Sequence, residues 1–472
     1  MKSIVFLIIA VSLIPCASFG AKKPNVLLIS IDDLNDWVGC MGGHPQAITP
    51  NLDRLAKRGT LFLNAHCQSP VCNPSRASMM SGKYPHSTGI YFLSPDLSQA
   101  AELEGRWMLP QYFQENGYET MAVGKIFHGG DKRFFQEYGG SNGGFGPRPK
   151  KKISQPHGHP LWDWGAFPDT DDKMPDQIAA NWAKKKLQQT YDKPFFMGVG
   201  FYRPHVPMFA PKKWFDLHPK DKIQLPKVLK TDRDDLSEYA IGLTNLKHVS
   251  PEHDWVVSAG QWEHAVQSYH ASVTFADYCL GQVLDALDAS PHADNTIIVL
   301  FSDHGFHLGE KQRWAKRTLW EDSARVPLIV SAPGFKADQA SSRPAELIDV
   351  FPTLIELTGL SAYEGLEGQS LVPLMKDPMR EWEHPAITSF GLGNYAVRST
   401  RYRYIRYLDG SEELYDHQSD PHEWHNIATK AEMSRVIAEH AAYLPRNEHP
   451  VLPGNSTGHK AYQATAEKLG LK

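Results

Sequence analysis

The sequence has little net charge and no regular repeat of glycine or proline. Its 472 residues hold 49 lysines and arginines against 53 aspartates and glutamates, a formal net charge of −4. This balance argues against a nucleic-acid binder, which usually carries a strong basic excess. The 36 glycines and 34 prolines recur without a period, which excludes a collagen-like chain. Hydrophobic residues at 41% and charged residues at 22% are instead typical of a folded protein with a buried core.

The sequence also has no hydrophobic run as long as the roughly 20 residues that span a bilayer. Its most apolar stretch, 4–14, follows a positively charged start, is broken by Pro15 and precedes small residues. This pattern is typical of a cleaved signal peptide, whereas proline before Cys16 disfavours a lipoprotein site. We therefore predict that residues 1–20 are a signal peptide and that the mature chain is exported. The expected location is periplasmic or extracellular, or lysosome-like if the host is eukaryotic, with no integral membrane association.

Cysteine is scarce, and only four cysteines follow the predicted signal peptide. They are Cys40, Cys67, Cys72 and Cys279. A chain of this length builds its core without disulfides, so these cysteines need not form a framework. A bridge between Cys40 and Cys67 stays open, because spacing alone does not fix pairing.

Short, nearly continuous apolar runs recur at long intervals, with helical patterns between them. Runs without alternation are typical of strands that are covered on both faces, as in a parallel sheet. We therefore predict an α/β domain over residues 21–375, with helices near 49–59 and 261–287. Beyond it, closely spaced β-rich pieces predict a smaller C-terminal α+β subdomain with an antiparallel sheet, residues 376–472. The clearest runs are 25–31, 119–123, 194–201, 295–301 and 326–331.

Polar side chains follow four of these strands directly. Because the carboxyl ends of parallel strands form the ligand crevice of an open α/β sheet, the four groups are expected to converge on one site. Each group alone is more typical of a turn, a helix cap or a surface histidine. The groups are Asp32-Asp33, Lys125 with His128, Arg203 with His205, and Asp303-His304.

Three carboxylates in one crevice predict a bound divalent cation. The oxygens of Asp32, Asp33 and Asp303 suit Ca²⁺ or Mg²⁺ better than softer metals. The imidazole of His304 is a more natural ligand of Zn²⁺ or Mn²⁺. On spacing alone, a catalytic zinc site therefore stays open.

Cys72 lies in a segment that predicts a short helix. Pro74 is placed for a helix start and Gly82 for its end, so Cys72 would lie at the positive N-terminus. A thiol there is acidic and reactive. The alternative is a small buried core residue.

This segment resembles the signature of a known family. Cys72-Asn73-Pro74-Ser75-Arg76, followed by Ser-Gly-Lys-Tyr-Pro at 81–85, is similar to the motif of the type I, formylglycine-dependent sulfatases of the alkaline phosphatase superfamily. The likeness runs from Pro24 to about Ile427. It is greatest to the iduronate-2-sulfatase branch, because of the segments 193–196, 203–207, 302–305, 308–310 and 314–316. That branch carries His at the position of His304, where many sulfatases carry Asn.

The resemblance implies an alkaline-phosphatase-like fold with a large mixed, mostly parallel sheet flanked by helices. It also implies that Cys72 is oxidised to formylglycine, whose hydrate is the nucleophile. Ca²⁺ would be held by Asp32, Asp33, Asp303, His304 and the modified Cys72.

The resemblance further implies roles for the remaining polar residues. Arg76 would stabilise the ionised hydrate, and the sulfate pocket would be lined by Lys125, His128, His205 and Lys316. His205 or Lys316 would protonate the leaving oxygen and His128 would act in collapse of the intermediate, although sequence does not separate these roles. Arg203 and Arg313 are candidates to bind a substrate carboxylate.

The expected function is that of an exported, calcium-dependent sulfatase of sulfated carbohydrates. The expected substrate is a 2-O-sulfated uronic acid at a chain end, and the expected partner is a formylglycine-generating or anaerobic sulfatase-maturating enzyme. One alternative is a phosphonate or phosphate mono- or diesterase of the same superfamily. Another is a non-catalytic binder of sulfated glycans. The stretch 129–176 is expected to be a long loop over the site, and the C-terminal part to close one wall of the pocket.

Overall fold

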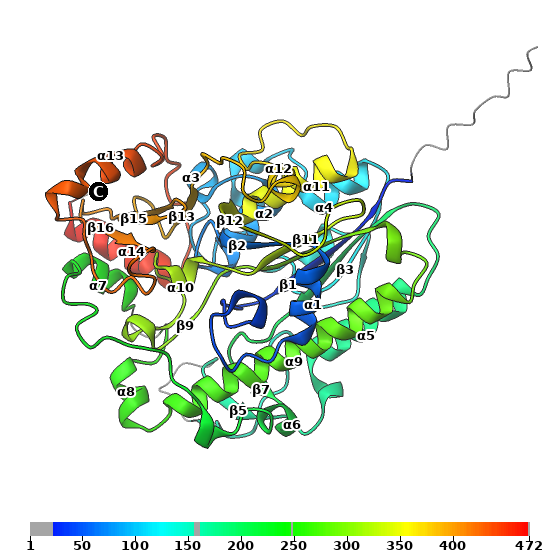
Figure 1. Cartoon of the computed structure of the whole chain (residues 1–472), viewed down its shortest axis with the longest axis horizontal. Coiled ribbons are helices and arrows are strands. Elements are labelled where there is room, and N and C mark those ends of the chain that lie inside the picture. Colours follow the sequence, from blue (N-terminus) through cyan, green and yellow to red (C-terminus); the bar gives the residue numbers. More distant parts are fainter. Residues whose placement is uncertain (1–21, 155–160, 247–248, 471–472) are drawn as a thin grey trace, which may run out of the picture.

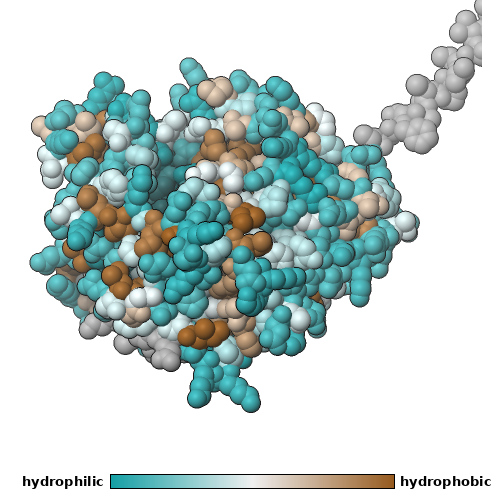
Figure 2. Space-filling view, turned by 60° about the horizontal axis from the view of Figure 1, so that its bottom comes forward, coloured by the Kyte–Doolittle hydropathy of each residue, from teal (hydrophilic) through white to brown (hydrophobic). Residues whose placement is uncertain are grey.

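The computed structural model describes residues 22–154, 161–246 and 249–470. The predicted signal peptide therefore lies outside the described residues. Within these ranges, no helix combines the length and hydrophobicity that crossing a membrane requires. On the face seen in Figure 2, hydrophobic residues form small groups among hydrophilic ones.

An eight-stranded sheet forms the centre of the molecule, in the order β12-β2-β11-β8-β1-β6-β3-β4 (Figure 1). β1 lies between β6 and β8 and is parallel to both. All five predicted strands are present, and the predicted mixed, mostly parallel sheet is confirmed. The strands are β1 Asn25–Ile31, β2 Thr60–His66, β3 Glu119–Gly124, β4 Glu137–Tyr138, β6 Phe195–Phe201, β8 Thr296–Ser302, β11 Leu328–Ser331 and β12 Gln339–Glu346.

The last predicted strand, β11, runs against its neighbours instead of with them. It pairs antiparallel with both β8 and β2. The 25 residues between β8 and β11 contain no helix longer than the four residues of α10 (Glu321–Ala324). Because no crossover helix returns the chain to the other end of the strands, β11 starts at the same end of the sheet where β8 finishes.

Helices cover both faces of the sheet (Figure 1). Alternate residues of β1 enter two separate cores, with Leu27 and Ile29 in one and Val26 and Leu28 in the other. One core is covered by α1 (Pro50–Arg58), α5 (Pro175–Leu187) and α9 (Trp262–Asp288). The other is covered by α2 (Cys72–Ser81), α4 (Leu109–Glu115), α11 (Val350–Thr358) and α12 (Val372–Lys376).

The predicted helices near 49–59 and 261–287 correspond to α1 and α9. Asp277 of α9 accepts hydrogen bonds from the backbone N–H groups of Asn51 and Leu52, at the start of α1. This contact stabilises the N-terminus of α1 and fixes the two helices against each other.

The C-terminal part forms the predicted small antiparallel sheet, at the left of Figure 1. Its strands follow one another in chain order: β13 Ala386–Ser389, β14 Tyr395–Arg398, β15 Tyr402–Arg406 and β16 Glu412–Asp416. Helices α13 (Ser434–Ala441) and α14 (Thr457–Lys468) follow. Shorter elements complete the chain: α3 Pro85–Thr88, β5 Trp164–Ala166, β7 Met208–Ala210, α6 Lys212–Phe215, α7 Glu238–Thr244, α8 His253–Ser258, β9 His307–Leu308 and β10 Trp314–Ala315.

The four cysteines of the described ranges are all free, so the bridge between Cys40 and Cys67 that the sequence left open is not formed. Cys67 lies in the core beneath α2, whereas Cys40 packs against the core beneath α9. The sheet therefore separates the two thiols.

Candidate active site

The turn after β1 is held by a tyrosine of α9. Asp33 has a φ of 63°, a left-handed conformation that aspartate tolerates better than most residues. The Tyr269 hydroxyl donates to the Asp33 carbonyl at 2.9 Å and accepts from the Asn35 N–H at 2.9 Å. The Asp33 N–H also donates to Asp303 Oδ1 at 3.2 Å, which joins the ends of β1 and β8.

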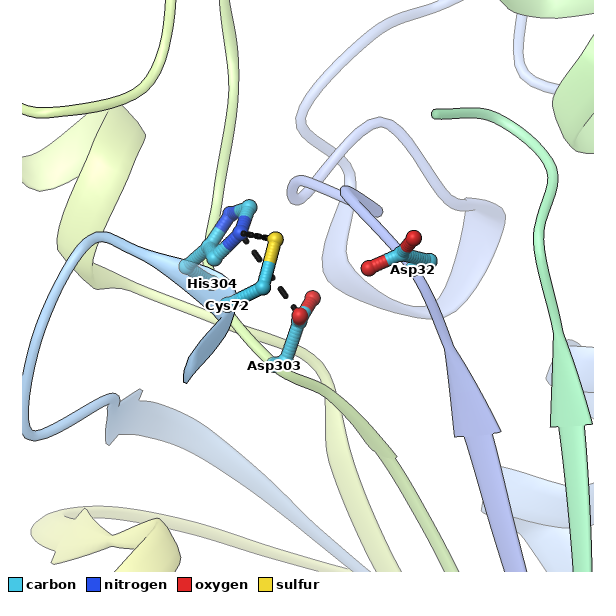
Figure 3. A group of neighbouring side chains, drawn as sticks. All are labelled: Asp32, Cys72, Asp303 and His304. Carbon is cyan, nitrogen blue, oxygen red and sulfur yellow. Dashed lines mark hydrogen bonds and ion pairs between the residues drawn. The ribbon is translucent and has the colours of Figure 1, made fainter. Parts of the chain in front are cut away.

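Asp32, Cys72, Asp303 and His304 point toward one another, as Figure 3 shows. All four are buried, and their ligand atoms lie within 4.8 Å of one another. Cys72 Sγ lies 3.2 Å from His304 Nε2, because His304 Nδ1 lies against the Gly305 carbonyl at 2.9 Å. That hydrogen bond keeps Nε2 directed into the cluster.

This cluster fits one divalent cation. Asp33 joins it with Oδ1, 3.3 Å from His304 Nε2, while its buried Oδ2 has no hydrogen-bond partner among the described residues. Oxygen ligands of Ca²⁺ lie about 2.3–2.6 Å from the ion, so atoms within 4.8 Å of one another can share it. Three carboxylates favour a hard cation over zinc.

Three cationic side chains form ion pairs with the three carboxylates. Arg76 Nε lies 2.9 Å from Asp303 Oδ2, and its Nη2 lies 3.1 Å from Asp32 Oδ1. Lys125 Nζ lies 2.6 Å from Asp32 Oδ2. Lys316 Nζ lies 2.6 Å from the Asp33 carboxylate and 3.3 Å from Cys72 Sγ. The Cys72 sulfur therefore faces a region of positive charge.

The surrounding charges shift the pKa values of the cluster. Burial alone would raise the pKa of the Cys72 thiol, but Lys125, Lys316 and His304 hold it well below its usual value. Burial, only partly offset by Arg76, raises the pKa of Asp303 to about 6. Burial disfavours the charged imidazole, yet Asp303 raises the pKa of His304 to about 9. Cys72 is therefore poised for reactivity rather than for packing.

A pocket of about 320 Å³ opens onto the Cys72 sulfur. His205 reaches it with Nε2, 3.8 Å from Asp33 Oδ2, while its Nδ1 lies against the Val206 carbonyl. The Phe145 ring stacks on His205 at 4.4 Å. The polar lining is Asp33, Cys72, His128, His205, Lys316, Arg317 and Thr457, and the apolar lining is Leu93, Phe145, Leu161, Trp162, Val206, Val249, Phe306 and Ala315.

Two predicted carboxylate binders lie outside this lining. Arg203 is fully buried and donates to the carbonyls of Phe145, His205 and Phe209. These bonds hold together the loops that carry Phe145 and His205. Arg313 is 3% exposed and donates to Asn245 Oδ1 at 3.2 Å. The structure thus brings the other predicted site residues together and leaves these two at the periphery.

The sequence did not predict the apolar lining of the pocket, nor Arg317 and Thr457. Arg317 directly follows Lys316, and this adjacency is the one signal that could have drawn attention to it. Phe145 and Trp162 lie in the predicted loop 129–176, which does reach the pocket. Thr457 comes from α14, and no local pattern indicates where that helix docks.

Comparisons with known proteins agree with the geometry. The family model described as Sulfatase matches residues 24–360, and that described as N-sulphoglucosamine sulphohydrolase, C-terminal, matches 309–449. A protein of Formosa agariphila named Sulfatase is 40% identical over 469 residues, covering 94% of this chain and 92% of its own. A Delta 4,5-hexuronate-2-O-sulfatase of Bacteroides thetaiotaomicron is 28% identical, covering 91% and 89%. Iduronate 2-sulfatase of Mus musculus is 30% identical, covering 85% and 90%.

Solved structures share the fold. A 2-O GAG sulfatase superposes with a TM-score of 0.70 at 24% identity, covering 96% of this chain and 94% of its own. A phosphonate monoester hydrolase of Agrobacterium radiobacter also gives 0.70, at 21% identity, covering 89% and 94%. The same architecture therefore occurs with two different chemistries.

Proposed function

The chain belongs to the sulfatase family and is a sulfuric ester hydrolase, and we propose that its substrate is a 2-O-sulfated uronic acid at the end of a sulfated carbohydrate chain. The observation that carries the proposal is the Cys72 sulfur, which lies between Lys316 and His304 and lines the pocket. Two relatives named for hexuronate and iduronate 2-O-desulfation support the choice of sugar. We also propose that the enzyme is exported, as the pattern of residues 1–20 indicates.

The cations of the pocket suit the charge of a sulfate ester. Its peripheral oxygens stay negative during hydrolysis, and more negative charge develops on the leaving oxygen. Lys125 and Lys316 border the Cys72 position with fixed ammonium groups. Fixed donors of this kind contribute about 3–4 kcal/mol each to transition-state stabilisation when they are well placed. They also bind the sulfate in one orientation.

Three residues of the pocket support the proposed proton transfers. His205 Nε2 faces the pocket because its Nδ1 is engaged by the Val206 carbonyl. His128 lies on the open side and is close enough to help lower the pKa of Cys72. We assign protonation of the leaving oxygen to His205 or Lys316, and proton removal at the Cys72 position to His128.

Two groups complete the proposed chemistry. Oxidation of Cys72 to formylglycine by a maturation enzyme would supply a hydrated aldehyde as nucleophile. Calcium held by Asp32, Asp33, Asp303 and His304 would supply a Lewis acid beside it. The carboxylate-rich ligand set described above supports this ion.

The decisive experiment is release of free sulfate, measured by ion chromatography. Protein from a formylglycine-competent host is incubated with a panel of sulfated saccharides that includes 2-O-sulfated uronate disaccharides. The expected result is sulfate from these disaccharides, none from Cys72→Ala, and normal release from the matched control Cys40→Ala, whose thiol lies outside the pocket. Sulfate from another saccharide alone would overturn the proposed sugar.

Because a phosphonate monoester hydrolase shares this fold, the test must also identify which anion the enzyme releases. Phosphonate and phosphate monoesters and diesters are offered in parallel. Release of phosphonate or phosphate in preference to sulfate would favour the esterase. Binding of sulfated glycan without release by protein whose Cys72 is modified would favour a non-catalytic binder.

A further inference from the structure

Arg317 lies in the pocket wall beside Lys316. It is 8% exposed, and its φ of 76° lies in the left-handed region that residues other than glycine seldom adopt. Its N–H donates to the Pro70 carbonyl at 3.2 Å, which ties this turn to the segment before Cys72. A strained backbone of this kind is common where a side chain must be held at a functional site.

The Arg317 side chain is a buried cation that forms no ion pair with any described residue. Its Nε is fully buried and unbonded, and no described residue forms an ion pair or hydrogen bond with the rest of the guanidinium. Burial lowers its pKa to about 10 against the opposing effect of Cys72, so it stays charged at neutral pH. Burying an unpaired charge is costly, so an anion that enters the pocket beside Arg317 would be stabilised by it.

Neighbouring arginines add to the positive charge instead of cancelling it. The buried Arg313 has an unbonded Nε and one neutral acceptor, Asn245. Burial and then the nearby charges of Arg233 and Arg317 lower its pKa to about 9. The Nε of Arg233 is likewise buried and unbonded. Three guanidinium groups therefore create a positive field behind the pocket wall.

The N-terminus of α14 reaches the same wall. Thr457, its first residue, lines the pocket together with Arg317. Arg317 also lies near Ser456 and Gly458, around a closed gap that is too small for a water molecule. The Ser456 hydroxyl bonds with His459 Nδ1 and does not cap the helix, so the amides of the first turn keep no side-chain acceptor. A helix N-terminus of 12 residues attracts anions through these amides and its dipole.

Resting on the proposed function, we propose that Arg317 and the first turn of α14 form a second anion subsite beside the sulfate-cleaving pocket. Its ligand is a second negatively charged substituent of the sugar substrate, a carboxylate or a further sulfate. Lys125 and Lys316 hold the sulfate that is removed, whereas Arg317 and α14 hold the charge that remains. The subsite selects sugars that carry two anionic groups and gives the C-terminal helix a direct part in specificity.

The test compares substrates that differ in the second charge alone. The first pair is a 2-O-sulfated uronate disaccharide and its carboxyl methyl ester. The second pair is the same disaccharide with and without a further sulfate on the neighbouring sugar. For each pair, the ratio of kcat/KM values measures discrimination in favour of the extra anion. If a variant of the subsite lowers the ratio of the first pair, the ligand is the carboxylate. If it lowers the ratio of the second pair, the ligand is the second sulfate.

Three variants probe the subsite. Arg317→Met is expected to reduce the kcat/KM ratio of at least one pair about tenfold. The change should arise mainly through KM, as expected when a buried charge contact is lost. Thr457→Asp is favourable for the start of a helix yet repels an anion, so the same ratio falls. Arg435→Met, at an exposed position of α13 away from the pocket, retains it. Equal losses on both members of each pair, or ratios that no variant alters, overturn the subsite.

Binding separates this proposal from the proposed function. Isothermal titration of the ligands of both pairs is carried out in Cys72→Ala and Cys72→Ala/Arg317→Met. If the wild type releases no sulfate from any uronate, the proposed function fails. A preference for the extra anion that disappears with Arg317→Met in either pair supports the subsite even then, and preferences unchanged in both pairs overturn it.

Discussion

At the scale of single residues, two buried arginines near the pocket have opposite environments. The Arg203 side chain donates to three carbonyls, whereas the Arg317 side chain donates to none among the described residues. Burial does not distinguish the two side chains, since both are buried. Their hydrogen bonds do, and they assign Arg203 to the architecture of the loops and Arg317 to a ligand.

Arg203→Met is therefore expected to lower stability and not substrate selection. The carbonyls of Phe145, His205 and Phe209 would lose a charged donor, at a cost on the order of 3 kcal/mol. Urea unfolding measures this loss. The preference for acid over ester substrate should stay at the wild-type ratio. A selective loss on the acid would instead restore Arg203 as a carboxylate binder.

A stack of aromatic rings around His270 predicts sensitivity to acid. His270 stacks on Trp37 and His218 at 5.1 and 5.2 Å, and both of its ring nitrogens are buried without a hydrogen bond. Burial, with nearby His44 and His218, holds its pKa well below 6.5, and burial lowers that of His218 to about 4. Below pH about 6.5, His218 and His270 bind protons in the unfolded chain but stay neutral in the folded chain. Stability falls there by up to about 1.4 kcal/mol per pH unit for each group.

His270→Phe removes this titration and keeps a stacked ring. It also removes an unsatisfied polar group, so the melting temperature is expected to rise at neutral pH. The gain over wild type should increase as the pH falls from 6.5 to 5. A constant difference across this range would show that His270 does not titrate on unfolding.

At the scale of elements, the sequence predicted the strands whose apolar runs are continuous and missed those with polar residues. β2 contains Asn64 and His66, and β12 (QASSRPAE) has no apolar run at all. Both strands form through pairing, because β12 lies parallel to β2 along its length. Such strands depend on neighbours that are distant in the chain, which local periodicity does not reveal.

Arg403 on β15 joins the small sheet to α10. Its guanidinium pairs with Glu321 and, at 2.7 Å, with Glu423, and donates to the Leu319 carbonyl. Arg403→Met removes one buried cation from Glu321, which keeps Arg398, and from Glu423, which keeps His417, so about 3 kcal/mol of stability should be lost. Urea unfolding of this variant is compared with that of Arg401→Met, whose arginine forms an exposed pair with Asp416. Equal, small losses would show that the buried network does not hold the two parts together.

At the scale of the whole molecule, the clustered carboxylates predict that calcium stabilises the folded state. A ligand that binds only the folded chain adds about 2.7 kcal/mol at a hundredfold excess over its Kd. The melting temperature should rise with CaCl₂ and fall with chelator. Asp303→Asn should lose most of the calcium-dependent shift. An equal shift in this variant would place the ion elsewhere.

The polar part of the site could be predicted because it follows the strands. Asp32, Lys125, His205 and Asp303 each lie just beyond a recognisable apolar run, and a parallel sheet brings such positions together. Thr457 is different, since it lies about 150 residues after the last of these strands and reaches the pocket only through docking of α14. Its place is a property of packing, not of local sequence.

The burial of Cys72 also has a consequence for how the protein is made. In the folded chain, Cys72 is 2% exposed, begins α2 and lines a pocket of about 320 Å³. We expect the proposed maturation enzyme to act on Cys72 before the chain folds, because a folded pocket of this size gives little access to the peptide around it. The active fraction of a preparation would then be set during synthesis, and later exposure of the folded protein to the enzyme would leave it unchanged.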